Sequence, residues 1–141
     1  MTPYKVLVLC TGNSARSILG EVLLNEIGQG KFEAYSAGSN PVGRVDPGAI
    51  DKLRAQGHDV SGLRSKSWDE FTGSDAPELN LVITVCDNAA GETCPAWNGA
   101  PLTLHWSLPD PAAFEEEAER RAAFDDVYDE LRSRIEALVK S

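Results

Sequence analysis

A strand, a short loop and a helix follow one another in residues 6–27, and this order constrains the fold more than any other feature. Residues 6–9 are Val and Leu only, which predicts a buried strand. Residues 15–27 carry apolar side chains three and four apart, which predicts an amphipathic helix. Because main-chain N–H groups and the helix dipole converge where a loop enters a helix, we expect the 10–17 loop to bind an oxyanion.

Two side chains of the 10–17 loop supply chemistry at that anion site. Arg16 can hold a tetrahedral anion through two hydrogen bonds, and Gly12 allows a tight turn around it. The same positive field favours the thiolate of Cys10, so we expect its pKa to fall below the usual value of about 8.5. The spacing of Cys10 and Arg16 is common by chance, but the flanking strand and helix favour a nucleophile in an anion site.

The sequence of the 10–17 loop, Cys-Thr-Gly-Asn-Ser-Ala-Arg-Ser, resembles the phosphate-binding loop of the low-molecular-weight protein tyrosine phosphatase fold. With Glu21 it is similar to the arsenate reductases built on that fold. The resemblance continues in order along the chain, at Tyr35-Ser36-Ala37-Gly38, Val85-Cys86, Cys94-Pro95, His105-Trp106 and Asp110-Pro111-Ala112. It implies that the substrate is held by Thr11, Gly12, Asn13, Ser14, Ala15, Arg16 and Ser17.

Composition restricts the class of protein. The 141 residues, 42% hydrophobic and 25% charged, suit a single domain over residues 1–141. A net charge of −9 argues against nucleic acid or an anionic membrane as a partner, and no apolar run approaches the roughly 20 residues of a membrane span. We expect a cytoplasmic monomer, since the N-terminus lacks a signal-peptide pattern. Three cysteines in a reducing compartment indicate reactive thiols or metal ligands.

Strand and helix patterns alternate along the chain. Strands are expected at residues 4–9, 32–36, 79–85 and 101–106, and helices at 15–27, after Asp46-Pro47, and over about 25 residues from Asp110-Pro111. This order predicts an α/β fold with an open, mostly parallel four-stranded sheet and helices on both faces. Ligands bind such sheets at the carboxyl ends of the strands. Cys10, Cys86 and the 108–110 loop all follow strands, so they should meet there.

Three polar residues near this edge have candidate roles, and two of them have two each. Asp110 can protonate an oxygen that leaves a tetrahedral oxyanion, or it can simply cap the helix that Pro111 begins, and both roles can coexist. Asn13 can brace the loop or contact the substrate. Ser17 can donate a hydrogen bond to the Cys10 thiolate.

The resemblance implies a redox relay of three cysteines. Cys10 attacks arsenate, Arg16 holds the oxyanion and Asp110 protonates the departing oxygen. Cys86 then attacks the Cys10 sulfur, arsenite leaves, and Cys94 moves the disulfide outward for reduction by thioredoxin, with no bound cofactor. Seven residues separate Cys86 from Cys94, one more than in the thioredoxin-coupled pattern, so a glutaredoxin with a small thiol remains an alternative electron donor.

The sequence offers two candidate metal sites, and we expect neither to hold a metal ion. In some similar reductases the positions of Asn13, Glu21, Ser36 and an Asp near residue 66 hold potassium. Lys66 stands at the last position here, and its ammonium group can take the place of the ion. A zinc site from Cys86, Cys94, His58 and His105 matches no usual ligand spacing.

Two other functions remain open. A phosphatase acting on phosphotyrosine or small phosphate esters would use the same loop and leave Cys86 and Cys94 as bystanders, although residues 39–46 lack an aromatic wall for a phenyl ring. A non-catalytic protein could bind an oxyanion or arsenite through its thiols. Phosphate or sulfate should mimic the substrate in every case.

Overall fold

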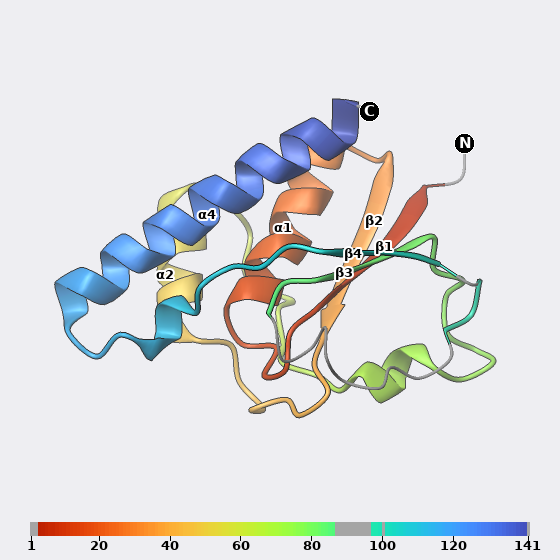
Figure 1. Ribbon diagram of the computed structural model, residues 1–141, viewed down its shortest axis with the longest axis horizontal. Coiled ribbons are helices and arrows are strands. Elements are labelled where there is room, and N and C mark those ends of the chain that lie inside the picture. The colour runs from red at the N-terminus through yellow and green to blue at the C-terminus, as the bar shows by residue number, and fades with distance from the viewer. Residues whose placement is uncertain (1–2, 87–96, 100, 141) are drawn as a thin grey trace.

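The computed structural model describes residues 3–86, 97–99 and 101–140. Its centre is a four-stranded sheet in the order β2-β1-β3-β4 (Figure 1). The strands are β1 (Tyr4–Leu9), β2 (Phe32–Ala37), β3 (Leu81–Thr84) and β4 (Leu102–His105). Each neighbouring pair is parallel, which confirms the predicted sheet.

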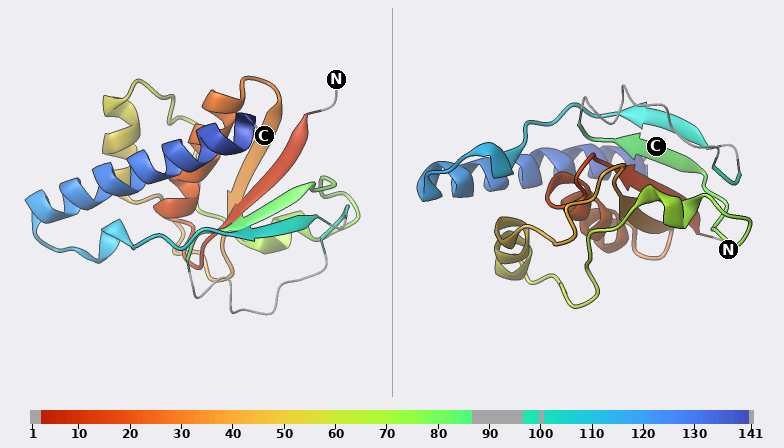
Figure 2. Two further views of the ribbon diagram at one scale, coloured as in Figure 1. Left: turned by 45° about the horizontal axis from the view of Figure 1, so that its top comes forward. Right: turned by 90° about the horizontal axis from the view of Figure 1, so that it is seen from below.

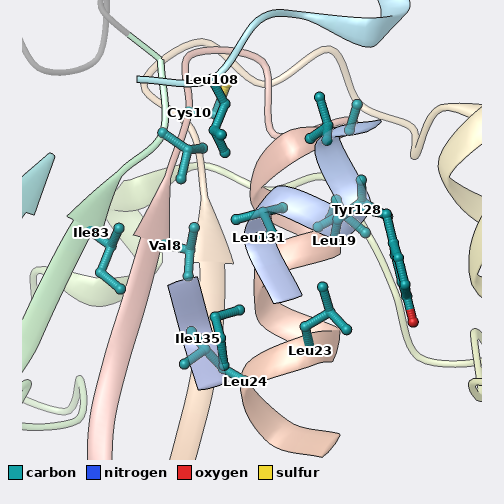
Figure 3. Packing of buried hydrophobic residues seen from close by; sticks show 14 of the residues in the cluster. Val8, Cys10, Leu19, Leu23, Leu24, Ile83, Leu108, Tyr128, Leu131 and Ile135 are labelled. Atoms are coloured by element: carbon teal, nitrogen blue, oxygen red, sulfur yellow. The ribbon is translucent and has the colours of Figure 1, made fainter. Parts of the chain in front are cut away.

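Three α-helices cover one face of the sheet (Figure 2). They are α1 (Arg16–Gly28), α2 (Pro47–Ala55) and α4 (Glu117–Lys140). Their apolar side chains share one core with residues of the strands, as Figure 3 shows for Val8, Leu19, Ile83 and Leu131. In α4, Phe124, Val127, Leu131 and Ile135 are buried and Leu138 is partly buried.

The other face of the sheet carries a smaller apolar cluster. Leu7, Leu9 and Val82 pack there against Phe71 and Leu79. Phe71 belongs to the 3-10 helix η1 (Trp68–Phe71), whose position across the sheet from α1 is visible in Figure 2. In the described part of the chain, α-helices therefore cover one face and a short 3-10 helix covers the other.

The last helix does not begin at Asp110-Pro111, so that prediction is wrong. Asp110 instead caps a 3-10 turn, η2 (Pro111–Ala113), and the chain is extended at Phe114 with φ −83° and ψ 132°. The carboxylate of Glu116 accepts hydrogen bonds from the main-chain N–H groups two and three residues further on, at 3.1 and 2.9 Å. Because Glu116 satisfies these N–H groups, α4 begins at Glu117.

The parallel strands bring the predicted site residues to one edge. Cys10 directly follows β1, Cys86 follows β3 by two residues, and the 106–110 segment follows β4. No helix in the described ranges is long and apolar enough to span a bilayer.

Candidate active site

The loop between β1 and α1 is held in shape by the side chain of Asn13. Asn13 is fully buried and adopts a left-handed backbone with φ 46°, which Asn tolerates better than most residues. Its amide nitrogen donates to the hydroxyl of Ser17 at 2.8 Å, and its amide oxygen accepts from the main-chain N–H of Lys66 at 2.9 Å. Asn13 therefore braces the 10–17 loop against both α1 and the 64–67 segment.

The N-terminus of α1 opens toward this loop. Ala15 occupies the capping position, and no side chain among the described residues caps it. The carbonyl of Ser14 accepts the main-chain N–H of Asp46 at 2.8 Å, which fixes the loop against the start of α2. The N–H groups at the start of α1 thus form the positive end of a helix dipole beside Cys10.

Arg16 reaches from α1 to the segment that follows β4. It donates to the carbonyl of Leu108 at 2.9 Å and lies 3.8 Å from a carboxylate oxygen of Asp110. Asp110 is half exposed, and its other oxygen accepts the main-chain N–H of Ala112 at 3.0 Å. Asp110 therefore both caps η2 and faces the guanidinium of Arg16.

Gly38, to which the sequence argument gave no role, lies against the main chain of the loop. A Cβ there would stand 2.4 Å from the carbonyl oxygen of Thr11 and 2.7 Å from that of Cys10. The main-chain N–H of Cys10 donates to Ala37 at 3.2 Å, and that of Asn40 donates to Thr11 at 3.0 Å. The glycine directly after β2 is the available sequence signal, since only glycine permits so close an approach.

Cys10 and Cys86 are hydrogen-bonded to each other and both are buried. Thr11, expected at the substrate, contacts the second cysteine: its main-chain N–H donates to the Cys86 sulfur at 3.4 Å, and its hydroxyl lies 3.6 Å from that sulfur. Figure 3 shows Cys10 beside Leu108 at the end of the apolar core. The two sulfurs are thus neighbours before any disulfide forms.

The pKa of Cys10 is raised well above its ordinary value, so the expected lowering is wrong for this arrangement. The hydrogen bond with Cys86 is the largest cause, and burial is the second. The charge of Arg16 and the N–H of Gly12 lower this pKa, as the loop sequence suggested, but do not outweigh the other two. The hydrogen bond with Cys86 therefore favours the thiol form of Cys10.

Glu21 and Lys66 form a partly buried ion pair below the loop. The Lys66 ammonium lies 3.7 Å from the Glu21 carboxylate, which also accepts the hydroxyl of Ser36 at 2.5 Å. Burial lowers the pKa of Lys66, while Glu21 opposes that shift. These residues do not fit a potassium site. The Lys66 ammonium group already pairs with the Glu21 carboxylate, and the Asn13 amide already bonds the Ser17 hydroxyl and the main-chain N–H of Lys66.

The remaining predicted residues do not join this cluster. His58 bonds Tyr128 of α4 at 2.7 Å, and His105 bonds Thr84 of β3 at 2.7 Å. Within the described ranges no three His, Cys, Asp or Glu side chains are grouped to hold a metal ion. Cys94 lies outside the described residues.

This fold and this loop define a class of protein. Residues 5–141 match the family of low molecular weight phosphotyrosine protein phosphatases, and the chain belongs to that family. Within it, the chain resembles arsenate reductases along its full length. It is 34% identical to the arsenate reductase of Halalkalibacterium halodurans over 142 residues, covering 100% of this chain and 99% of the relative.

Solved structures give the same picture. An arsenate reductase in the phosphate-binding state superposes with a TM-score of 0.78 at 28% identity, over 97% of both chains. The tyrosine phosphatase Wzb from Escherichia coli K30, in complex with sulphate, superposes with a TM-score of 0.73 at 26% identity, over 96% of both chains. The fold is therefore shared by reductases and phosphatases, and the side chains beside Cys10 must distinguish them.

Proposed function

We propose that this protein reduces arsenate to arsenite, with Cys10 as the nucleophile and Cys86 as the resolving thiol. The observation that carries the proposal is the hydrogen bond between the two buried cysteines. A phosphatase needs one nucleophilic cysteine, whereas a reductase needs a second thiol within reach of the first. The full-length similarity to arsenate reductases supports the same activity.

In the first step Cys10 gives its thiol proton to an oxygen of bound arsenate, the Cys10 sulfur attacks the arsenic, and a hydroxyl group leaves. Arg16 and the N–H groups at the start of α1 hold the oxyanion. Asp110, 3.8 Å from Arg16 and half exposed, donates a proton so that the oxygen leaves as water. The product is a Cys10–arsenic(V) adduct.

In the second step the Cys86 thiolate attacks the Cys10 sulfur. The sulfur–sulfur bond forms while the sulfur–arsenic bond breaks, and its electron pair stays on arsenic, which leaves as arsenite. The main-chain N–H of Thr11 donates to the Cys86 sulfur at 3.4 Å and the Thr11 hydroxyl lies 3.6 Å from it, so both contacts hold this sulfur next to the loop that carries Cys10. A Cys10–Cys86 disulfide remains.

The disulfide is then transferred from Cys10–Cys86 to a second cysteine pair. Cys94 attacks Cys86, and thioredoxin reduces the Cys86–Cys94 disulfide, so electrons come from a partner protein and no cofactor is bound. We assign this relay to a cytoplasmic monomer with a single domain over residues 1–141. Its support is the presence of three cysteines and the family resemblance.

Phosphatase activity is the second candidate. It is favoured by the family itself and by the structural match to a tyrosine phosphatase. Hydrolysis of a phosphocysteine does not use Cys86, whose contact with Cys10 would raise the Cys10 pKa without a compensating role. We therefore expect at most weak phosphatase activity.

The test is arsenate-dependent NADPH oxidation in the presence of thioredoxin and thioredoxin reductase. Cys10→Ser, Cys86→Ser and Cys94→Ser should each abolish turnover, and p-nitrophenyl phosphate should be a poor substrate. If only Cys10→Ser is inactive and the phosphate ester is the better substrate, the protein is a phosphatase. Activity with glutaredoxin and glutathione, but not with thioredoxin, would retain the chemistry and change the electron donor.

A further inference from the structure

Asp110 lies on a segment with little regular secondary structure of its own. Its side chain is 45% exposed, and η2, which it caps, has only three residues. A proton donor must be held within hydrogen-bond reach of the leaving oxygen. Something outside this segment must therefore fix its main chain relative to Cys10.

Arg120, in the first turns of α4, makes that connection. One guanidinium nitrogen donates to the carbonyls of Ala112 and Phe114, at 3.2 and 3.4 Å, on either side of the end of η2. The other guanidinium nitrogen forms a short ion pair with the carboxylate of Asp46. Arg120 thus joins the main chain just after Asp110 to a residue at the start of α2.

Asp46 in turn is fixed to the 10–17 loop. Its main-chain N–H donates to the carbonyl of Ser14 at 2.8 Å, and its carboxylate accepts the main-chain N–H of Gly48 at 2.8 Å. The Asp46 side chain is 14% exposed, so its pairing with Arg120 is poorly screened by water. In Figure 1 the N-terminal part of α4 lies beside α2, where this bridge forms.

The guanidinium group of Arg120 is suited to joining these two segments. A guanidinium group has five donors in a fixed plane, so it can bind two carbonyls and a carboxylate at once, whereas an ammonium group is a point charge. The guanidinium also lies 5.6 Å from the centre of the Phe124 ring, which orients it further. Two arginines therefore hold the acid segment: Arg16 from one side and Arg120 from the other.

We propose that Arg120 is a positioning residue, which places Asp110 for proton transfer by tying the main chain of η2 through Asp46 to the 10–17 loop. The inference rests on the proposed function, in which Asp110 is the proton donor. Arg120 itself does not touch the substrate, so it should affect the rate of the chemical step and not the binding of the oxyanion.

The experiment measures a single turnover of fully reduced enzyme in excess over arsenate, with disulfide formation followed by the loss of free thiols. This readout is independent of the external electron donor. Asp110→Asn should slow the maximal rate about 100-fold, as expected for the loss of a general acid. Arg120→Ala should slow it about tenfold, with the enzyme concentration that half-saturates this rate changed less than about threefold, as for a misplaced acid.

The double variant Arg120→Ala/Asp110→Asn decides whether Arg120 acts through Asp110. Its rate should equal that of Asp110→Asn within about twofold, because the two residues would serve one proton transfer. Arg121→Ala is the matched control: Arg121 is 73% exposed and pairs only within α4, with Glu117 at 3.0 Å among its described contacts, so its removal should leave the rate unchanged.

Chemical rescue adds a readout that a general loss of stability would not give. Arg120 lines a cavity of about 420 Å³ between α2 and α4, through which exogenous guanidinium can reach the vacated position. Millimolar guanidinium should raise the rate of Arg120→Ala severalfold and leave the double variant unchanged. Arg120→Lys should fall between Arg120→Ala and the wild type.

Three results would overturn the proposal: a wild-type rate in Arg120→Ala, the same tenfold loss in the Asp110→Asn background, or a loss confined to arsenate binding. A wild-type rate in Asp110→Asn would instead remove Asp110 as the proton donor, and the role of Arg120 with it. If Arg120→Ala fails to fold, the comparison of Arg120→Lys in both backgrounds gives the same decision.

Discussion

The main-chain N–H of Thr11 donates to the sulfur of Cys86 at 3.4 Å, so the loop after β1 reaches directly to the cysteine after β3. Cys86 in turn is hydrogen-bonded to Cys10. The acidity of Cys10 therefore depends on Cys86, and this coupling can be measured.

Replacing Cys86 with Ala should lower the pKa of Cys10. The hydrogen bond that the Cys10 thiol donates to Cys86 is the largest cause of the raised pKa, and its loss leaves Arg16 and the Gly12 N–H to act against burial alone. At a fixed pH the thiolate fraction of Cys10 then rises, so iodoacetamide should alkylate Cys10 faster than in the wild type. The midpoint of the pH dependence of this alkylation rate should move to lower pH. Both proteins should carry Cys94→Ser, and peptide mass spectrometry should read Cys10 alone. An unchanged midpoint would contradict the coupling.

Phosphate or sulfate should stabilise the protein through Arg16. A ligand at 100 times its dissociation constant adds about 2.7 kcal/mol to the free energy of unfolding. Arg16→Ala should lose most of the rise in melting temperature, and Arg16→Lys should retain part of it, because an ammonium group cannot bind two oxygens in one plane. An undiminished rise in Arg16→Ala would place the anion elsewhere.

Lys66→Met should destabilise the fold by about 2 kcal/mol, since it leaves the partly buried carboxylate of Glu21 without its cation. Lys5→Met is the control: Lys5 pairs with Glu33 at 3.9 Å on the surface, and its loss should cost under about 0.5 kcal/mol. Urea unfolding measures both.

The same ion pair predicts the response to salts. The wild type should melt at the same temperature in potassium and sodium chloride of equal ionic strength, because Lys66 already supplies the charge beside Glu21. A rise in melting temperature specific to potassium would show that the ion binds despite the ammonium group.

Gly38→Ala should distort the 10–17 loop. A Cβ would stand 2.4 Å from the carbonyl oxygen of Thr11, and main chain cannot yield as a flexible side chain can. We expect a loss of at least about 2 kcal/mol and a weaker rise in melting temperature with phosphate. Gly62→Ala is the control, since a Cβ there meets nothing within 4 Å. Equal behaviour of the two variants would contradict the close approach at Gly38.

Glu116→Ala should cost about 1 kcal/mol, because its carboxylate bonds two main-chain N–H groups at the start of α4. The exposed neighbour Glu115 gives the control Glu115→Ala, expected within about 0.5 kcal/mol of the wild type. Thermal unfolding distinguishes them, and a similar loss in both would argue against a specific cap.

Local signals were sufficient for most of the fold. The apolar run of β1, the spacing of apolar residues in α1 and the Asp46-Pro47 start of α2 each act over a few residues, and all are found as predicted. The parallel order then follows from alternation of strands and helices. Asp110-Pro111 does not start α4 because the same cap and proline also begin a 3-10 turn, and a later cap at Glu116 decides where α4 starts.

The site was harder to predict, because its properties depend on residues far apart in the chain. The loop sequence identifies the favourable influences on Cys10, Arg16 and Gly12, but not the stronger influence of Cys86, which only the fold brings to its side. The need for glycine at position 38 likewise depends on how closely the main chain after β2 approaches that of the 10–17 loop. Neither effect has a local pattern.

The hydrogen bond from Arg16 to the carbonyl of Leu108 bears on selectivity in salty surroundings. An incoming anion competes with the Leu108 carbonyl for the Arg16 guanidinium, so an anion that makes only one weak contact with Arg16 gains little binding free energy. A tetrahedral anion with two oxygens side by side can compensate for that lost contact, whereas chloride, a sphere with one point of attachment, cannot. Abundant halide should therefore leave the site open to rare oxyanions.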